Sequence, residues 1–303
     1  MKIFITGASG FIGSAVAEAF ARNGHEVWGL VRTAAKARAL AEREIEPIVG
    51  SMDDSSLFLE RAGLCDVLVH CAAEYSARTM ELDKRVIDEL TTTATRAQAP
   101  RLFLYTSGVW IYGNRGEERV TEASPIQPPR IAAIRAEHER LVLAADRGAL
   151  RTMVIRPGCV YGGSGSLTSY WFESAMKQGA ALVVGDGANR WAMVHREDLA
   201  ELYLRAAESS HRAEIFNAVD RSRFTQLECA RAASHAAGAG GKVTHMSEVE
   251  SQAAYRAMAE CLAFDQHVDA SKAVRMLGWQ PRHGGFVDGV ARYFTAWKAS
   301  QGR

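Results

Sequence analysis

The sequence predicts an α/β protein with a doubly wound, parallel Rossmann sheet and a smaller C-terminal substrate lobe. Two observations lead to this prediction. Short β-rich runs alternate with amphipathic helical runs through the first 160 residues, and such alternation indicates right-handed βαβ crossovers. A glycine-rich turn, Gly7–Gly13, lies between the first β-rich run and the first helical run. Rossmann folds bind a diphosphate at this position.

The β-rich runs are short and rich in branched apolar side chains, which is typical of buried parallel strands. They are Lys2–Thr6, Glu26–Val31, Ile45–Val49, Asp66–His70, Arg101–Thr106 and Arg151–Arg156. Apolar residues at helical spacing predict the helices between them. These helices are Phe11–Asn23, Thr33–Arg43, Asp53–Arg61, 78–97 and Ile131–Arg147.

The character of the chain changes after residue 160, so we expect a dinucleotide-binding core over 1–160 and a substrate lobe over 161–303. The two parts are interleaved, because a strand near 214–217 returns to the core. Four helices are predicted in this half, at Leu167–Gln178, Glu197–Glu208, Gln226–Ala237 and Phe286–Ala299. Ligands of open α/β sheets bind at the carboxyl edge, where we expect this lobe to pack.

Composition and charge limit the binding partners and the cellular compartment that we expect for the protein. A net charge of +1 over 303 residues gives no reason to expect nucleic acid as a partner. The chain starts directly with a strand and has no long apolar stretch, so neither a signal peptide nor a membrane partner is expected. Five cysteines without a C-x-x-C pair fit free thiols in the cytoplasm.

The glycine loop has the residues that a diphosphate needs. Gly7 permits a tight turn, Gly10 lets the backbone approach the ligand, and Gly13 allows close packing of helix on strand. The helix that follows offers unpaired N–H groups and a partial positive charge. We therefore expect a nicotinamide dinucleotide to be bound by Gly7, Ser9, Gly10, Phe11, Ile12 and Gly13.

Arg32 favours NADP over NAD as the cofactor. It follows the second strand, 19 residues after Gly13, where an NAD-selective protein would have an acidic residue for the ribose hydroxyl. A guanidinium suits a 2′-phosphate instead. NAD is kept as the alternative, with Arg32 as a solvated residue at the start of a helix.

Several segments together resemble the extended short-chain dehydrogenase/reductase superfamily, in its NAD-dependent epimerase/dehydratase branch. The matching segments cover nearly the whole chain. They are TGASGFIG (6–13), GSMDD (50–54), VLVHCAA (67–73), LYTSGVWIYG (104–113), IRPGCVYGGSG (155–165), MVHREDLAELY (193–203) and WQP (279–281).

The resemblance implies roles for residues at the ends of successive strands. The adenine would lie between Ser51 and Met52, and the ribose and diphosphate beside Ala72 and Ala73. The nicotinamide would lie near four further residues, Thr106, Ser107, Pro157 and Gly158. His195 and Asp198 would have structural roles at the start of a helix. A homodimer through the helices near 78–97 and 131–147 is also implied.

The catalytic pair of the family is missing. The resemblance implies Tyr-x-x-x-Lys, but Ile131 and Arg135 stand at the two positions. Isoleucine cannot transfer a proton, and arginine keeps its charge, so it can bind a ribose but cannot act as an acid. The serine position also differs: counted back from Tyr112, the hydroxyl would fall on Gly108, with Ser107 one residue earlier.

Two interpretations follow. In the first, the protein is an NAD(P)-dependent oxidoreductase or epimerase/dehydratase-like enzyme for a small carbonyl-type substrate. Its candidate catalytic residues are Ser107, Tyr112 and Arg135; Tyr75, Tyr161 and His138 are further candidates for the proton donor. In the second, it binds the dinucleotide as a sensor or regulator, without redox turnover.

The remaining sequence patterns say less about function. The nine histidines lack metal-ligand spacing, so no metal site is expected. The aromatic residues of the predicted crevice could line a flat apolar pocket or simply pack in the lobe; they are Trp110, Tyr112, Tyr170, Trp171, Phe172 and Trp191. Arg190 is either a contact for an anionic substrate group or a solvated loop residue.

Overall fold

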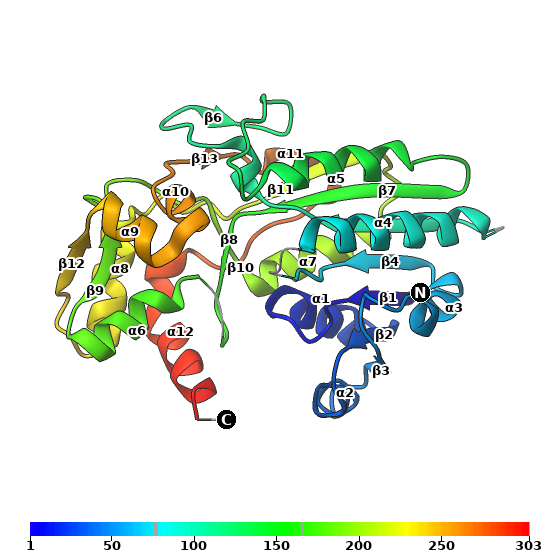
Figure 1. Cartoon of the computed structure of the whole chain (residues 1–303), viewed down its shortest axis with the longest axis horizontal. Coiled ribbons are helices and arrows are strands. Elements are labelled where there is room, and N and C mark those ends of the chain that lie inside the picture. The colour runs from blue at the N-terminus through cyan, green and yellow to red at the C-terminus, as the bar shows by residue number, and fades with distance from the viewer. Residues whose placement is uncertain (75–77, 98, 165–166, 303) are drawn as a thin grey trace.

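A computed structural model describes residues 1–74, 78–97, 99–164 and 167–302 of the chain (Figure 1). Its centre is a seven-stranded, all-parallel sheet in the order β3-β2-β1-β4-β5-β7-β11. The strands are β1 (Lys2–Thr6), β2 (Glu26–Val31), β3 (Glu46–Val49), β4 (Val67–His70), β5 (Arg101–Thr106), β7 (Leu150–Pro157) and β11 (Glu214–Ala218). This order confirms the predicted Rossmann fold.

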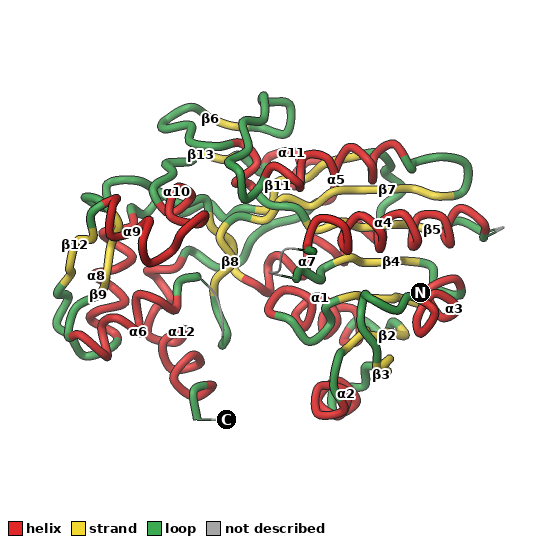
Figure 2. Tube along the Cα trace, viewed as in Figure 1, coloured by secondary structure: helices red, strands yellow, loops and turns green. Residues whose placement is uncertain are grey.

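Helices cover both faces of the sheet, as Figure 2 shows. One face packs against α1 (Phe11–Arg22), α2 (Ala34–Ala41), α7 (Arg196–Glu208) and α11 (Ser271–Leu277). The other packs against α3 (Ser56–Gly63), α4 (Thr79–Arg96) and α5 (Ala133–Ala144). Alternate side chains of each strand enter the two apolar cores, because successive residues of a strand point to opposite faces.

The lobe lies at one end of the sheet, on the left in Figure 1, and has its own apolar core. Its elements are α6 (Ser169–Gln178), β9 (Ala181–Val184), α8 (Gln226–Ala236), β12 (Val243–Met246), α9 (Glu248–Tyr255), α10 (Ala259–Leu262) and α12 (Phe286–Ser300). The chain leaves the lobe to form α7 and β11 in the core and then returns, so the two parts are interleaved.

Short elements join the core to the lobe. They are η1 (Val109–Tyr112), β6 (Arg119–Val120), β8 (Cys159–Tyr161), β10 (Met193–His195) and β13 (His267–Val268), whereas η2 (Arg256–Met258) lies within the lobe between α9 and α10. β8 pairs with β10, and β6 pairs with β13. These two small sheets connect segments that are distant in sequence, and they fix the lobe beside the carboxyl ends of the strands.

The sequence places the start of α5 two residues too early. Ala132 donates its backbone N–H to the carbonyl of Pro129, so the chain makes a turn after the two prolines before the helix begins at Ala133. Ile131 lies in this turn and is 38% exposed.

The helices bear on two expected properties of the protein, the lack of a membrane partner and a homodimer. Among the helices of the described ranges, none has both the length and the apolar character needed to cross a bilayer. The long helices α4 and α5 lie side by side on one face of the sheet, and a homodimer through them stays a prediction.

Candidate coenzyme-binding and active site

The glycine loop connects β1 to α1 in a geometry that requires glycine. Gly7 has a φ of +70°, and a Cβ atom there would lie 2.7 Å from the backbone N and Cα of Ala72. A side chain on Gly13 would collide with the carbonyl oxygen of Gly7. Gly10 donates its N–H to that same carbonyl at 2.8 Å. The loop is therefore held closely against the end of β4.

The start of α1 is open to an anionic ligand. Gly10 is the N-cap residue and has no side chain to cap the first turn of the helix. Phe11 and Ile12 begin the helix and are half-buried. Because the first N–H groups of a helix lack intrahelical partners, this end of α1 fits the diphosphate of a dinucleotide.

Arg32 lies beside this loop, because it directly follows β2 and β2 pairs with β1. Its side chain is exposed. The next residue, Thr33, caps α2 by accepting a hydrogen bond from the backbone of Lys36 at 3.3 Å. Arg32 and Lys36 thus place two cations at the start of α2, and Lys36 lines the same cavity as Ser9 of the glycine loop.

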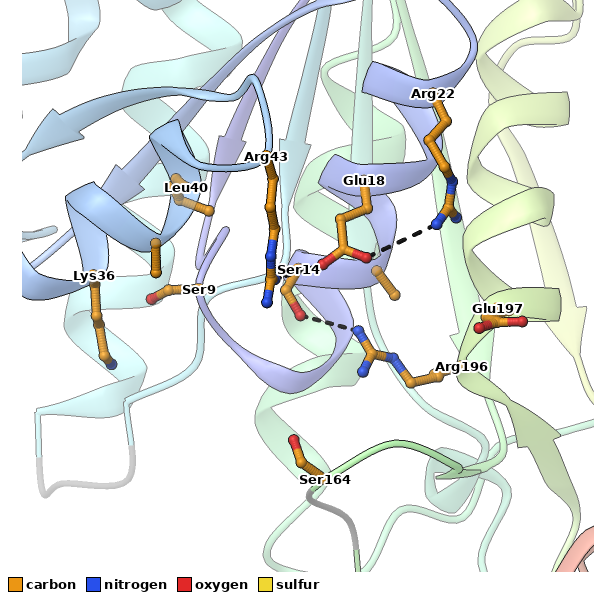
Figure 3. Close-up of a pocket in the computed structure, with 12 residues that line it drawn as sticks. Ser9, Ser14, Glu18, Arg22, Lys36, Leu40, Arg43, Ser164, Arg196 and Glu197 are labelled. Carbon is orange, nitrogen blue, oxygen red and sulfur yellow. Dashed lines mark hydrogen bonds and ion pairs between the residues drawn. The ribbon is translucent and has the colours of Figure 1, made fainter. Parts of the chain in front are cut away.

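A cavity of about 390 Å³ lies between α1, α2 and the start of α7, with Ser9 and Lys36 at one end (Figure 3). Basic residues outnumber acidic ones in its lining: Arg22, Lys36, Arg43 and Arg196 against Glu18 and Glu197. The excess of positive charge beside the glycine loop favours an anionic group in this cavity.

Arg196 begins α7 and reaches toward α1 in this cavity. It donates to the Ser14 hydroxyl at 3.2 Å, and its guanidinium carbon lies 5.5 Å from the ring centre of Phe11. Burial lowers the pKa of Arg196. Its Nε is buried and has no hydrogen-bond partner in the described part of the chain. A cation in this situation gains from an anion nearby.

The residues expected around the adenine follow β3. Ser51 accepts a hydrogen bond from the backbone of Asp53 at 3.2 Å, and the Met52 carbonyl accepts one from Arg85 at 2.7 Å. Both Ser51 and Met52 are half-buried. The contact with Arg85 ties this turn to α4, so its backbone has a defined position at the edge of the sheet.

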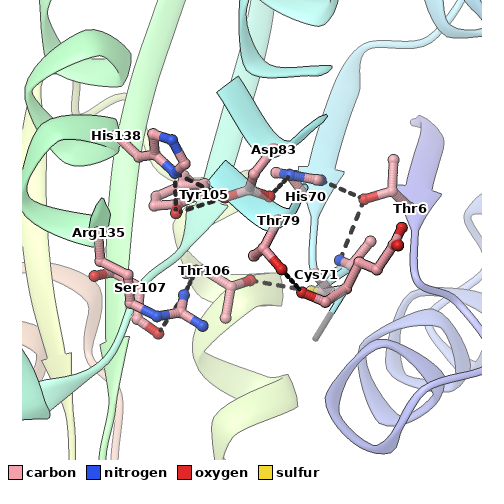
Figure 4. Close-up of polar contacts among 12 residues, drawn as sticks. Thr6, His70, Cys71, Thr79, Asp83, Tyr105, Thr106, Ser107, Arg135 and His138 are labelled. Atoms are coloured by element: carbon pink, nitrogen blue, oxygen red, sulfur yellow. Dashed lines mark hydrogen bonds and ion pairs between the residues drawn. The ribbon is translucent and has the colours of Figure 1, made fainter. Parts of the chain in front are cut away.

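The end of β5 carries a hydroxyl without a partner. Ser107 is 5% exposed, and its Oγ has no hydrogen-bond partner among the residues that the structure describes. Arg135 of α5 donates to the carbonyl oxygens of Thr106 at 2.8 Å and Ser107 at 3.4 Å (Figure 4). The structure therefore brings the predicted residues Thr106, Ser107 and Arg135 together.

The other predicted residues of the nicotinamide pocket lie at the ends of neighbouring strands. The Thr106 hydroxyl bonds to the Tyr203 hydroxyl at 2.6 Å and to the Cys71 sulfur at 3.2 Å. Pro157 ends β7, and Gly158 donates its N–H to the Ala218 carbonyl at 3.0 Å. Since β4, β5 and β7 are adjacent in the sheet, these residues share one region of the carboxyl edge with Ala72 and Ala73.

Tyr112 is turned into the protein interior. Its side chain is fully buried, and its hydroxyl donates to Asn217 at 2.8 Å and accepts from Arg156 at 2.7 Å. Arg156 in turn forms a two-bond ion pair with Glu139, at 2.9 and 2.5 Å. Burial raises the pKa of Tyr112. These contacts give the phenol a structural role under the substrate lobe.

The described members of the further candidates for the proton donor are also buried and contact acidic side chains. Tyr161 is fully buried and donates to Asp220 at 3.0 Å, and burial raises its pKa. His138 is buried with its Nδ1 2.8 Å from Asp83, while its Nε2 has no hydrogen-bond partner among the described residues. Tyr75 lies outside the described residues. Among the described candidates, the hydroxyl of Ser107 is therefore the best placed to donate a hydrogen bond to a substrate.

Three side chains at the start of α7 and before α12 come close enough to raise the question of a metal. Ligand atoms of His195, Glu197 and His283 lie within 4.8 Å of one another. However, Nδ1 of His195 accepts a hydrogen bond from the backbone of Glu197 at 3.2 Å, so its Nε2 carries the hydrogen and has no lone pair for a metal. Instead, the rings of His195 and His283 stack at 3.5 Å.

Asp198 and the lobe aromatics have packing roles. Asp198 accepts hydrogen bonds from the backbones of Arg282 and His283, each at 3.0 Å, which fixes the segment before α12. Trp171 and Trp191 are buried and stacked, with ring centres 5.2 Å apart. Arg190 pairs with Glu117 at 2.5 Å.

Comparison with known proteins adds to this geometry. The profile of the NAD dependent epimerase/dehydratase family matches residues 3–218. A relative in Schizosaccharomyces pombe, described only as uncharacterised, is 28% identical over 96% of this chain and 98% of its own. A Stigmatella aurantiaca enzyme, 4-hydroxy-2-methyl-3-oxo-4-farnesyl-3,4-dihydroquinoline-1-oxide ketoreductase, is 27% identical over 73% of this chain and 68% of its own.

Solved structures with the same fold contain nicotinamide dinucleotides. UDP-glucuronic acid 4-epimerase from Bacillus cereus, in complex with UDP-glucuronic acid and NAD, has a TM-score of 0.82 at 18% identity, over 99% of both chains. The human epimerase family protein SDR39U1 with NADPH has a TM-score of 0.77 at 20% identity, over 100% of both chains. A nicotinamide dinucleotide is the coenzyme that these findings support.

Proposed function

The chain belongs to the NAD-dependent epimerase/dehydratase family and is an NAD(P)-dependent enzyme; from this premise we propose that it is an NADPH-dependent reductase of a small carbonyl compound. The observation that carries the proposal is the buried hydroxyl of Ser107 beside Arg135, which has no hydrogen-bond partner in the described ranges. A buried hydroxyl without a partner is costly, and a substrate oxygen would give it one.

The preference for NADPH over NADH rests on Arg32 and Lys36. Both follow β2, and Lys36 lines the same cavity as Ser9, so a 2′-phosphate at the start of α2 would meet the Lys36 cation and the Ser9 hydroxyl, with the exposed Arg32 at the end of β2. Charge-assisted hydrogen bonds of this kind are stronger than neutral ones. No acidic side chain occupies the position of Arg32, where NAD-selective proteins bind the ribose hydroxyl.

The reaction divides between the coenzyme and the chain. When bound, the reduced coenzyme would supply the hydride for the carbonyl carbon, and one proton from solvent would complete the alcohol. Ser107 would donate a hydrogen bond to the substrate oxygen as negative charge develops on it. Arg135 cannot donate its proton; it holds the Thr106 and Ser107 carbonyls and thereby fixes the direction of the serine hydroxyl.

Reduction is favoured over sugar epimerisation because of position 131. The family resemblance implies a tyrosine there, whereas Ile131 is 38% exposed in the turn before α5. Without that phenol the chain lacks the acid–base group on which epimerisation depends. A carbonyl reduction needs less from the protein, since a polarised oxygen can take its proton from water.

The test is to follow the absorbance of NADPH with a panel of aldehydes, ketones and imines. We expect turnover of at least one carbonyl compound, and a loss of about 100-fold in kcat for Ser107→Ala, the usual cost of one oxyanion donor. Ser234→Ala is a matched control, because Ser234 is also fully buried with an unpartnered hydroxyl but lies in the lobe helix α8. Tight NADPH binding without turnover on any panel member would favour a sensor and refute the reductase.

A further inference from the structure

A buried carboxylate links four elements below the candidate site. Asp83 of α4 contacts His70 of β4 at 2.7 Å, His138 of α5 at 2.8 Å and the Tyr105 hydroxyl of β5 at 3.2 Å (Figure 4). Both imidazoles are fully shielded from solvent, and the Asp83 side chain is 15% exposed. No sequence pattern predicts a role for Asp83 or Tyr105, or for the side chain of His70.

The charge of Asp83 determines the direction of these hydrogen bonds. Burial raises the pKa of the Asp83 carboxyl, but the neighbouring His70 and His138 lower it well below its usual range. An ionised carboxylate only accepts hydrogen bonds, so His70 must carry a hydrogen on Nε2. The contact at 2.7 Å is therefore a charge-assisted hydrogen bond from His70 to Asp83.

The position of the hydrogen on His70 also sets the direction of its hydrogen bond with Thr6, at the end of β1. Its Nδ1 lies 2.6 Å from the Thr6 hydroxyl. No other acceptor for that hydroxyl is found among the described residues, so Thr6 donates and Nδ1 accepts. The remaining lone pairs of the Thr6 oxygen face the backbone N–H of Ala72, at 3.4 Å. Asp83 thus controls the orientation of an acceptor for Ala72.

Asp83, His70, Tyr105, His138 and Thr6 form one hydrogen-bonded network, and both of its ends lie next to the candidate site. Ala72 packs on the glycine loop so closely that Gly7 has no room for a Cβ atom. On the other side, His138 lies one helical turn after Arg135, which holds the carbonyls of Thr106 and Ser107. The network therefore joins the loop that would bind the diphosphate to the strand end that would meet the nicotinamide.

We propose that Asp83 is a positioning residue for the coenzyme. Its charge fixes the tautomer of His70, and through Thr6 it holds Ala72 against Gly7 in the arrangement that a bound dinucleotide requires. The inference rests on the proposed coenzyme binding and adds a residue that does not touch the coenzyme. A carboxylate that merely stabilised the fold would affect unfolding without a specific effect on affinity.

Asp83→Asn separates the two roles when it is compared with Asp146→Asn. The Asp146 side chain is 7% exposed and accepts hydrogen bonds from the backbones of Thr152 at 2.8 Å and Ala213 at 3.1 Å. It lies before β7, at the opposite end of the sheet. Both variants should unfold at lower temperature. We expect the dissociation constant for NADPH, measured by titration calorimetry, to rise at least 10-fold in Asp83→Asn and less than 2-fold in Asp146→Asn.

Thr6 supplies a second pair of variants in case Asp83→Asn does not fold. Thr6→Val keeps the shape but removes the hydroxyl, and Thr6→Ser restores it. We expect Thr6→Val to weaken NADPH binding several-fold and Thr6→Ser to bind like the unaltered protein. Equal affinities of the unaltered protein, Asp83→Asn and Thr6→Val would overturn the inference while leaving the proposed function intact. Absence of NADPH binding in the unaltered protein would instead refute the proposed function.

The tautomer of His70 gives a readout independent of affinity. Nitrogen-15 NMR of the unaltered protein should show His70 with a hydrogen on Nε2 and an accepting Nδ1, and the signal should change in Asp83→Asn but not in Asp146→Asn. A hydrogen on Nδ1 of His70, or a doubly protonated ring, in the unaltered protein would contradict the proposed direction of the hydrogen bonds.

Discussion

Arg135 donates a hydrogen bond to the backbone carbonyl of Thr106 at 2.8 Å and so ties α5 to the end of β5. The family resemblance implies a lysine at this position. Lysine has a shorter reach to two carbonyls and no planar fork, so Arg135→Lys should not preserve the contact. We expect kcat with a carbonyl substrate to fall about 10-fold, with further loss in Arg135→Met, since misplaced catalytic groups cost rate steeply.

The control for this prediction is Arg140, an exposed arginine later in the same helix. Arg140→Lys should leave kcat unchanged. If Arg135→Lys instead raised kcat, residue 135 would act as the family lysine does. The hydrogen bonds from Arg135 to the carbonyls of Thr106 and Ser107 would then have no catalytic importance. Steady-state kinetics with saturating NADPH distinguishes these outcomes.

Gly10→Ala should weaken coenzyme binding strongly and stability only modestly, since the Gly7 carbonyl must shift by a few tenths of an ångström to admit the methyl group. Gly10 is exposed, has an ordinary φ of −81°, and a Cβ atom would lie 3.1 Å from the Gly7 carbonyl oxygen. The added methyl group would instead occupy the space through which a diphosphate approaches the backbone. We expect at least a 10-fold higher dissociation constant for NADPH. Gly63→Ala, in α3 with a Cβ contact of 3.3 Å to Thr93, should bind NADPH normally.

The proposed choice of coenzyme is testable at Arg32 and Lys36. Replacing Arg32 by Asp should lower affinity for NADPH and raise affinity for NADH, because a carboxylate repels the phosphate and binds the ribose hydroxyls. Lys36→Gln should weaken NADPH binding only. Removing one exposed charge contact typically costs up to about 1 kcal/mol, so we expect a change of a few-fold in Lys36→Gln. Unchanged selectivity in both variants would argue against a 2′-phosphate site here.

Much of the core could be predicted from the sequence because its signals are local. The alternation of strands and helices and the glycine loop each extend over fewer than about 20 residues, and all agree with the observed order. The Asp83 network could not be predicted. Members in direct contact are separated by up to 66 residues in sequence, and only the order of the parallel strands brings them together.

Tyr112 shows a second limit of sequence reasoning. It follows Ser107 closely along the chain, which made it a candidate proton donor. The intervening η1 turns its hydroxyl toward Arg156 and Asn217, whose own positions depend on β7 and β11. The direction of a side chain after a strand end depends on such distant neighbours, and no local pattern encodes it.

This placement predicts that Tyr112→Phe affects stability and not turnover. The variant removes one hydroxyl that satisfies both Arg156 and Asn217, which should cost about 1–3 kcal/mol because buried polar groups lose their partner. We expect a lower unfolding temperature and a kcat within about 2-fold of the unaltered protein. Denaturant unfolding and NADPH kinetics on the same preparation provide both numbers. A large loss of kcat with unchanged stability would restore Tyr112 as the proton donor.

His195 predicts how stability depends on pH. Burial, the neighbouring His283 and the charges of Arg292 and Arg196 lower its pKa to about 3. Below the ordinary pKa of 6.5 the unfolded chain therefore binds a proton that the folded chain does not, so stability falls as the pH decreases through this window. From pH 6.5 to pH 5 the loss should approach about 2 kcal/mol. Asn accepts the Glu197 N–H as a helix cap and does not titrate, so His195→Asn should lose correspondingly less stability over this range. Urea unfolding at the two pH values measures the difference, and equal losses in both proteins would show that His195 is not the group responsible.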